Sequence, residues 1–196
     1  LNRSPQRLVI EFLDLYHAAT TDQLATLFWG GRRRLAQYHL RRLVESGRLT
    51  RHPHPLDRRG PYVYRLAGRA PGQKTAHQLA AVDFYLALRR DLARQGARSV
   101  PELAWSDQVR PDQTVWWRQA TWAVEHHLSG RFEHARDYAQ FLERGDYLAC
   151  HWWRRDLAPE DQTIGLLVVT EPQYLEHVRR QMARWLPRPG SCRQGE

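Results

Sequence analysis

The sequence predicts an α+β protein in two parts: a helical module that ends in a β-hairpin, then an α/β domain with a mixed sheet flanked by helices. The 196 residues are enough for two small domains, and helical and strand periodicities follow one another in a clear order. The charge also divides unevenly. Residues 1–70 hold 13 Arg and five acidic residues, a formal +8, whereas the remainder holds 17 Lys and Arg against 16 acidic residues, a formal +1. This asymmetry indicates a basic module with a polyanionic partner.

Three amphipathic helices are expected in the basic module. The first covers 5–17 and begins after a Ser-Pro pair, which is typical of a helix N-terminus. The second opens at the threonine pair 20–21 and ends at two glycines. The third covers about 32–46 with an apolar stripe, and Gly47 ends it in the position expected of a helix stop.

A β-hairpin is expected after the third helix. Two short strand-like segments, 48–51 and 62–66, flank a tip rich in Pro, Arg and Gly at 52–60. Three helices and a hairpin within about seventy residues resemble the winged-helix family. The segment LRRLVESGRLTRH is similar to that family's run from recognition helix into wing. The resemblance implies a DNA-binding domain whose third helix enters the major groove.

The candidate DNA-contacting residues lie on the third helix and the wing. Those in the first helical turns are placed to reach base edges, and those further along suit phosphates. Those on the wing suit the adjacent backbone or the minor groove. The candidates are Arg33, Arg34 and Gln37 for base edges; Arg41, Arg42 and Arg48 for phosphates; Arg51, Arg58 and Arg59 on the wing; and Arg32 and Tyr38 beside them. A protein-contact role is the alternative, but three arginines that oppose their own helix dipole favour a phosphate partner.

The nearly neutral module begins near residue 71. Its pattern predicts the order helix, three strands, helix, strand, helix, hence a mixed sheet. The elements expected are a helix at 74–95, strands at 102–106, 113–118 and 121–128, a helix at 131–144, a strand at 163–170 and a last helix from Pro172. The nearly all-apolar segment 163–170 predicts a buried central strand. The expected domains are 1–70 and 71–188, followed by a flexible tail at 189–196.

Short acidic motifs add a second resemblance. Arg110-Pro111-Asp112 on the approach to one strand, with Glu125 in the next, resembles the PD-(D/E)xK nuclease fold, which is restriction-endonuclease-like. Residues 5–186 as a whole are similar to the replication-relaxation family, in which a winged helix precedes such a domain. His77, the helix carrying Tyr138 and the segment LLVVTEPQ also support this likeness. The resemblance implies a protein of a plasmid or other mobile element that acts in replication, transfer or their regulation.

Nuclease chemistry would need two carboxylates on one Mg²⁺ and a lysine. Asp112 and Glu125 are separated by twelve residues, which suits adjacent strands that converge on the ion. His127 occupies the place of the motif lysine and would act as a base; Lys74, the only lysine, lies before the linking helix. The alternative is that Asp112 caps a turn and Glu125 pairs with an arginine. The missing lysine favours an inactive domain with no cofactor, whereas an active one would require Mg²⁺.

The leading hypothesis is a double-stranded DNA-binding protein whose second domain dimerises or recruits a replication or conjugation protein. A homodimer is expected because winged helices commonly read paired half-sites. The alternatives are a Mg²⁺-dependent endonuclease targeted by the winged helix and an autonomous transcriptional repressor. Two distant cysteines without a CxxC and no apolar run of eighteen residues lead us to expect a cytoplasmic protein with no membrane partner.

Overall fold

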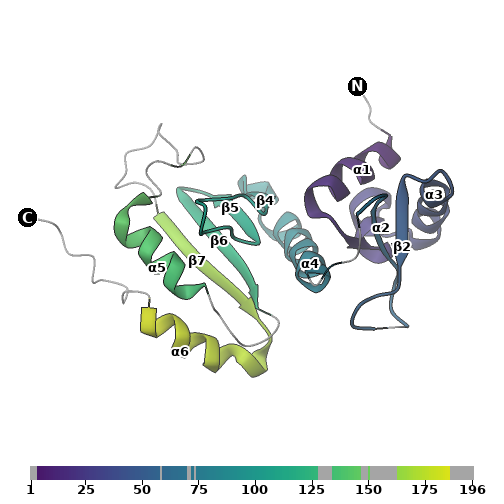
Figure 1. Cartoon of the computed structure of the whole chain (residues 1–196). Helices are drawn as coiled ribbons and strands as arrows, with labels where there is room; N and C mark the ends of the chain where they lie inside the picture. The colour runs from purple at the N-terminus through teal and green to yellow at the C-terminus, as the bar shows by residue number, and fades with distance from the viewer. Residues whose placement is uncertain are drawn as a thin grey trace, which may run out of the picture. The chain divides into compact units, whose positions relative to one another are not determined.

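The structure is a computed structural model that describes residues 4–57, 59–69, 72, 74–127, 134–146, 150 and 163–185. The chain divides into two units, Leu1–Ala97 and Arg98–Glu196 (Figure 1). Across the described residues there are six α-helices and two sheets, which confirms the α+β class. None of the helices in these ranges is long and apolar enough to cross a membrane.

The first unit has the winged helix-turn-helix arrangement that the sequence predicts. Its strands form an antiparallel sheet in the order β1-β3-β2. Strand β1 was not predicted, because two residues are too few to show a periodicity. In chain order the elements are α1 (Pro5–Tyr16), β1 (Ala19–Thr20), α2 (Thr21–Trp29), α3 (Arg33–Glu45), β2 (Leu49–His52), β3 (Val63–Leu66), α4 (Thr75–Asp91) and the 3-10 helix η1 (Ala93–Gln95).

Local capping chemistry sets the bounds of these helices. Ser4 caps α1 by accepting from the Arg7 N–H. At α2, the Thr20 hydroxyl accepts from the Gln23 N–H at 3.2 Å, and the Gln23 side chain accepts from the Thr20 N–H at 2.8 Å. Gly47 follows α3 with φ +69°, a left-handed conformation that glycine adopts without strain. The inward stripes of the three helices meet in one apolar core that includes Val9, Leu13, Leu24, Leu40 and Leu49.

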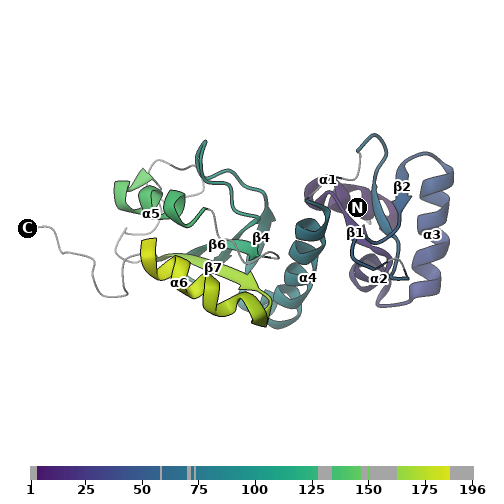
Figure 2. The same cartoon turned by 60° about the horizontal axis from the view of Figure 1, so that its bottom comes forward.

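Helix α4 belongs to the first unit, which corrects the expected boundary at residue 71. It packs against α1, α2 and β1, on the side of this unit opposite to α3 (Figure 2). The Gln23 side-chain amide donates to the Leu79 carbonyl at 3.0 Å and to the Asp83 carboxylate at 2.7 Å. With the boundary after Ala97, the first unit holds 17 Lys and Arg against seven acidic residues, and the charge asymmetry grows to +10 against −1.

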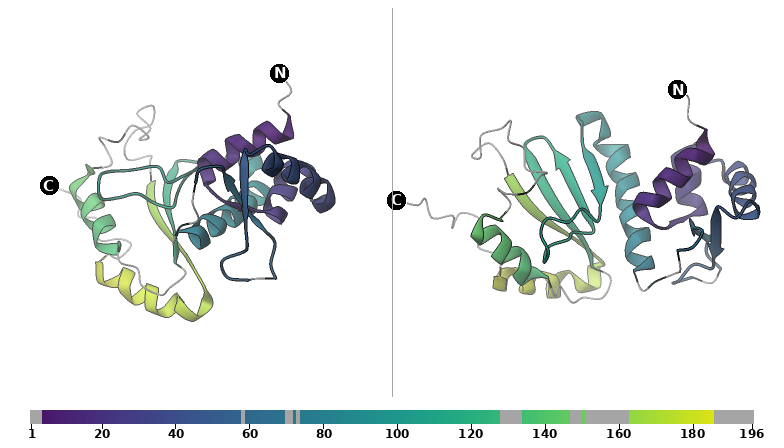
Figure 3. Two further views of the ribbon diagram at one scale, coloured as in Figure 1. Left: turned by 45° about the vertical axis from the view of Figure 1, so that its right-hand side comes forward. Right: turned by 45° about the horizontal axis from the view of Figure 1, so that its top comes forward.

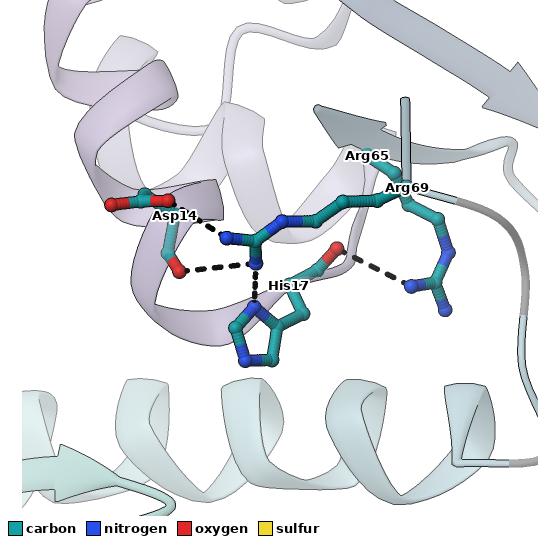
Figure 4. A network of polar contacts seen from close by, with 4 residues as sticks. All are labelled: Asp14, His17, Arg65 and Arg69. Atoms are coloured by element: carbon teal, nitrogen blue, oxygen red, sulfur yellow. Dashed lines mark hydrogen bonds and ion pairs between the residues drawn. The ribbon is translucent and has the colours of Figure 1, made fainter. Parts of the chain in front are cut away.

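A buried arginine on β3, whose bond to the His17 carbonyl is drawn in Figure 4, joins α4 to the winged helix. Arg65 is 3% exposed. Its guanidinium donates to the Thr75 hydroxyl at 2.6 Å and the Gln78 side-chain oxygen at 2.9 Å, both on α4, and to the His17 carbonyl at 3.5 Å. Burial, followed by the nearby Arg69 charge, lowers the pKa of Arg65 below its ordinary value. One side chain thus links the end of α1, strand β3 and the start of α4.

Arg69 completes this network at the protein surface. It donates to the Asp14 carboxylate at 2.9 Å and contacts the His17 ring nitrogen (Figure 4). Helix α1 has no basic residue in its own last turn. Arg65 and Arg69 therefore place positive charge at the negative end of the α1 dipole from outside the helix.

The second unit contains the expected mixed sheet, in the order β4-β5-β6-β7. Strands β4, β5 and β6 are antiparallel, and β7 runs parallel to β6 after a crossover that contains α5. Its elements are β4 (Arg98–Pro101), β5 (Gln113–Trp117), β6 (Ala120–His127), α5 (Ala135–Arg144), β7 (Thr163–Thr170), the 3-10 helix η4 (Pro172–Tyr174) and α6 (Leu175–Trp185). The expected tail at 189–196 lies outside the described residues.

Three expectations for this unit were wrong. The first strand is 98–101 rather than 102–106, because Glu102 has φ +48° and cannot continue a strand. Strand β7 is not central: in the described sheet it pairs with β6 alone, and Leu167 is 41% exposed. Helices α5 and α6 do not flank the sheet but cover one face, where Tyr138 and Met182 join the same apolar cluster (Figure 3).

Candidate nucleic-acid interface

Helix α3 presents a cationic surface on the side opposite to its buried stripe. Ala36, Leu40 and Leu43 are buried, and Leu40 is completely inaccessible. The candidate residues on and beside the helix are all exposed: Arg32, Arg33, Arg34, Gln37, Tyr38, Arg41, Arg42 and Arg48. The helix therefore contributes its apolar residues to the core while its arginines face outward, as its 3.6-residue period predicts.

The N-terminus of α3 carries positive charge without a compensating acidic residue of its own. Its first turn contains no Asp or Glu, and its N-cap residue, Arg32, makes no side-chain cap. The Arg32 side chain instead donates to the Trp29 carbonyl at 3.1 Å, which holds it back against α2. The helix dipole adds partial positive charge at the same end. The result is a strongly electropositive helix start.

The arginines of α3 differ in their partners. Arg33 forms an ion pair with Asp22 of α2, with its Nε 3.0 Å from a carboxylate oxygen. Arg41 pairs with Glu45 at 2.7 Å, one turn further along the same helix. Arg34 has no ion pair within the part of the chain that the structure describes. Sequence reasoning missed the Asp22 pair, because the two residues lie on different helices and share no motif.

Tyr38 and Arg42 form a small cation–π pair on the exposed face. The Arg42 guanidinium lies 5.9 Å from the centre of the Tyr38 ring, and Tyr38 is 56% exposed. Tyr38 thus follows the base-edge candidate Gln37 directly and contacts the phosphate candidate Arg42 one turn further along α3.

The wing adds a second cationic surface. The Arg51 guanidinium lies 4.3 Å from the centre of the Tyr62 ring, which fixes its direction across the hairpin. Arg59 is exposed, and its N–H donates to the Asp57 carboxylate at 2.9 Å. Arg58 lies outside the described residues. The wing thus supplies Arg51 and Arg59 in the same unit as the cationic helix α3.

Asp112 and Glu125 lie close together, as their spacing predicts. Gln113 pairs with Val124 across β5 and β6, so Asp112, directly before β5, comes opposite Glu125, two residues before the end of β6. The Asp112 carboxylate accepts from the His126 N–H at 2.8 Å, which ties the start of β5 to the end of β6. His127 is buried two residues after Glu125, on the same face of the sheet by strand alternation.

The Glu125 carboxylate is engaged by a tyrosine of α5. The Tyr138 hydroxyl donates to it at 2.5 Å, and both side chains are buried. Burial, followed by the Glu125 charge, raises the pKa of Tyr138 well above its ordinary value. Neither the His126 bond to Asp112 nor the Tyr138 bond to Glu125 was expected from the sequence. The sequence placed Tyr138 on an inward face but gave no sign of its partner.

Asp112 and Glu125 supply two of the ligands that the sequence predicts for Mg²⁺. Each of the two carboxylates accepts a protein hydrogen bond. No group of three or more His, Cys, Asp or Glu suited to a metal ion occurs among the described residues. Mg²⁺ in proteins is commonly held by one or two carboxylates together with waters and substrate phosphates. Asp112 and Glu125 are therefore the residues that would hold the ion in the endonuclease alternative.

Comparisons with known proteins give little further information. No protein-family model matches the chain, and no curated protein matches it. Among solved structures it is similar to a transcriptional regulator from Thermotoga maritima, with 22% sequence identity and a TM-score of 0.31. The match covers 46% of this chain and 62% of that one, so the chain spans less than two thirds of the regulator's length. A TM-score this low carries no weight for the function.

Proposed function

We propose that this chain is a double-stranded DNA-binding regulatory protein that inserts α3 into the major groove. The observation that carries the proposal is the outward cationic face of α3 opposite its buried stripe. The major groove admits one helix, and a protein that neutralises phosphates with arginine gains affinity from the counterions it releases. The charge of the first unit, +10 against −1 for the second, supports the same partner.

The partners of the arginines support a division of roles along this surface. Arg33 and Gln37 lie near the start of α3, where base edges are reached first. Arg34 and Arg48 have no ion pair in the described ranges and are available for phosphates. Arg51 on the wing follows the neighbouring backbone or minor groove.

Binding of a labelled duplex across a salt series tests this proposal. The full chain should bind in dilute buffer. A plot of the logarithm of its binding constant against the logarithm of the salt concentration should have a slope of about −0.9 for each phosphate that it neutralises. Arg34→Ala and Arg48→Ala should each flatten that slope by about 1. Arg90→Ala is a matched control, because Arg90 is an exposed arginine on α4, away from the proposed surface, and pairs with Asp91 at 2.7 Å. A chain that ignores duplex DNA at low salt would refute the proposal.

The finer role stays a prediction from the sequence. In that prediction the chain acts in the replication, transfer or regulation of a plasmid or mobile element, and its second domain dimerises or recruits a replication or conjugation protein. The sheet of the second unit supports an interaction role, since Leu167 of its strand β7 remains exposed. Footprinting on the chain's own upstream DNA tests the transcriptional alternative, which requires a palindromic protected site.

An endonuclease remains the second candidate, because Asp112 and Glu125 face each other across β5 and β6. The test is nicking of supercoiled plasmid with Mg²⁺ or Mn²⁺. Nicking that is lost in both Asp112→Ala and Glu125→Ala would support the enzyme. Nicking that persists in both variants would indicate a contaminant.

A further inference from the structure

We infer that Asp22 is a positioning residue that holds Arg33 for the recognition of a guanine, and that it increases sequence discrimination while reducing affinity for DNA in general. The inference rests on the proposed function and deepens it, because it names the base that the first turn of α3 reads. It also assigns a role to an acidic residue beside a surface whose partner is an anion.

The position of Asp22 is fixed independently of Arg33. Asp22 lies in the first turn of α2, where the positive end of the helix dipole favours a carboxylate. The Thr20–Gln23 capping box fixes the backbone of the same turn. Arg33 reaches this carboxylate from the first turn of α3, so the ion pair joins two helices and not two turns of one. The backbone that carries the carboxylate is therefore fixed, and the flexible Arg33 side chain reaches across to it.

The ion pair involves the Nε of Arg33 and not its two terminal nitrogens. The ion pair engages the Arg33 Nε at 3.0 Å, and the Arg33 side chain is 55% exposed. Its two terminal nitrogens can then donate in parallel to O6 and N7 of a guanine, the commonest specific contact in the major groove. An arginine already tied in one direction loses less conformational freedom on binding. The same tie resists the bending of Arg33 towards a phosphate.

Stability does not explain the pair. Asp22 is 49% exposed, and ion pairs between such half-exposed groups contribute little to folding. Near a phosphate backbone the carboxylate instead costs affinity, because it repels every DNA sequence equally. A residue that weakens general binding and orients one base-reading group improves the ratio of specific to non-specific affinity.

The neighbouring arginine provides a matched control. Arg34 lies in the same turn of α3 and is also exposed, but within the described ranges it has no ion pair. It is available to phosphates and is not tied to one direction. Arg33 and Arg34 should therefore fail in different ways when each is replaced by alanine.

The test uses the full chain and a library of duplexes randomised at the centre, followed by affinity measurements on the selected site. Each base pair of that site is then replaced in turn, and a mixed-sequence duplex serves as the general competitor. Arg33→Ala should lose discrimination at one G·C pair by about 5- to 150-fold. Asp22→Asn should lose part of the discrimination at that same pair and bind the mixed-sequence duplex more tightly. Arg34→Ala should weaken binding to all sequences alike.

The outcomes separate this inference from the proposed function. The inference is overturned if Asp22→Asn lowers the affinity for all duplexes alike, or if it leaves the discrimination at that G·C pair unchanged. A selected site without a guanine at the position that Arg33→Ala affects also overturns it. If Arg34→Ala still shows a reduced salt slope in those cases, the proposed function stands. If the unmodified chain retains no duplex in dilute buffer, the proposed function itself fails.

Discussion

Replacing Arg65 with leucine should release α4 from the winged helix. The side chain is 3% exposed and donates two short hydrogen bonds, to Thr75 at 2.6 Å and to Gln78 at 2.9 Å. Hydrogen bonds from a charged donor contribute about 1.5–3 kcal/mol each, so the two amount to roughly 3–6 kcal/mol. The bond to the His17 carbonyl, at 3.5 Å, adds little.

Part of this loss is offset. The guanidinium loses hydration on burial, and burial, followed by the Arg69 charge, lowers the pKa of Arg65. Leucine removes this desolvation cost and fills some of the space of the aliphatic stem. We expect a net loss of about 2–4 kcal/mol. In a unit of about one hundred residues this corresponds to a fall in melting temperature of roughly 10–25 °C.

Hydrogen exchange read by mass spectrometry locates the effect. In Arg65→Leu the amides of α4 should exchange faster, while those of β5 and β6 in the second unit keep their protection. Arg69→Leu is the matched control: its Asp14 partner is 63% exposed, so the change should cost about 1 kcal/mol or less. Unchanged α4 protection in Arg65→Leu, or an equal effect of Arg69→Leu, would refute the reasoning.

Three further predictions concern single contacts. Below about pH 10 the Tyr138 hydroxyl keeps its proton in both the folded and the unfolded chain, but above that pH only the unfolded chain loses it. The free energy of unfolding should therefore fall by up to about 1.4 kcal/mol per pH unit above about pH 10. Tyr138→Phe should reduce this pH dependence in alkaline denaturation curves. Thr20→Ala should cost about 1 kcal/mol in urea unfolding by removing the α2 cap, while Thr20→Ser keeps it; equal losses would contradict the capping role. Gly165→Ala should lower the free energy of unfolding by about 1–3 kcal/mol, because the added Cβ would overlap the Trp122 ring. This loss should be smaller in a Trp122→Leu background.

Local signals made the basic module predictable. A Ser-Pro start, a threonine cap and a glycine stop act within a few residues of one another, so the bounds of α1, α2 and α3 follow from the sequence. The strand at 163–170 was also predicted at its full length, because eight nearly all-apolar residues form one clear run. The position of this strand in the sheet was not predicted, because an apolar run does not show whether one or two strands pair with it.

The same limit applies to the candidate sites. The period of α3 identified the outward arginines, but the pairing of Arg33 with Asp22 depends on how two helices meet. The spacing of Asp112 and Glu125 predicted adjacent strands, but the Tyr138 bond to Glu125 depends on where α5 crosses the sheet. Such contacts join residues whose separation in sequence has no fixed relation to their distance in space.

The sequence by itself determined the helices and all strands except β1 and β4, the apolar face of α3, and the concentration of positive charge in the N-terminal part. Only the tertiary structure decided that α4 packs with the winged helix, that β7 is an edge strand of the sheet in the described residues, and that Asp22 forms an ion pair with Arg33. The reason is physical. Hydrogen-bond geometry within an element repeats every few residues and leaves a pattern in the sequence, whereas the choice of packing partner is made by the whole chain at once.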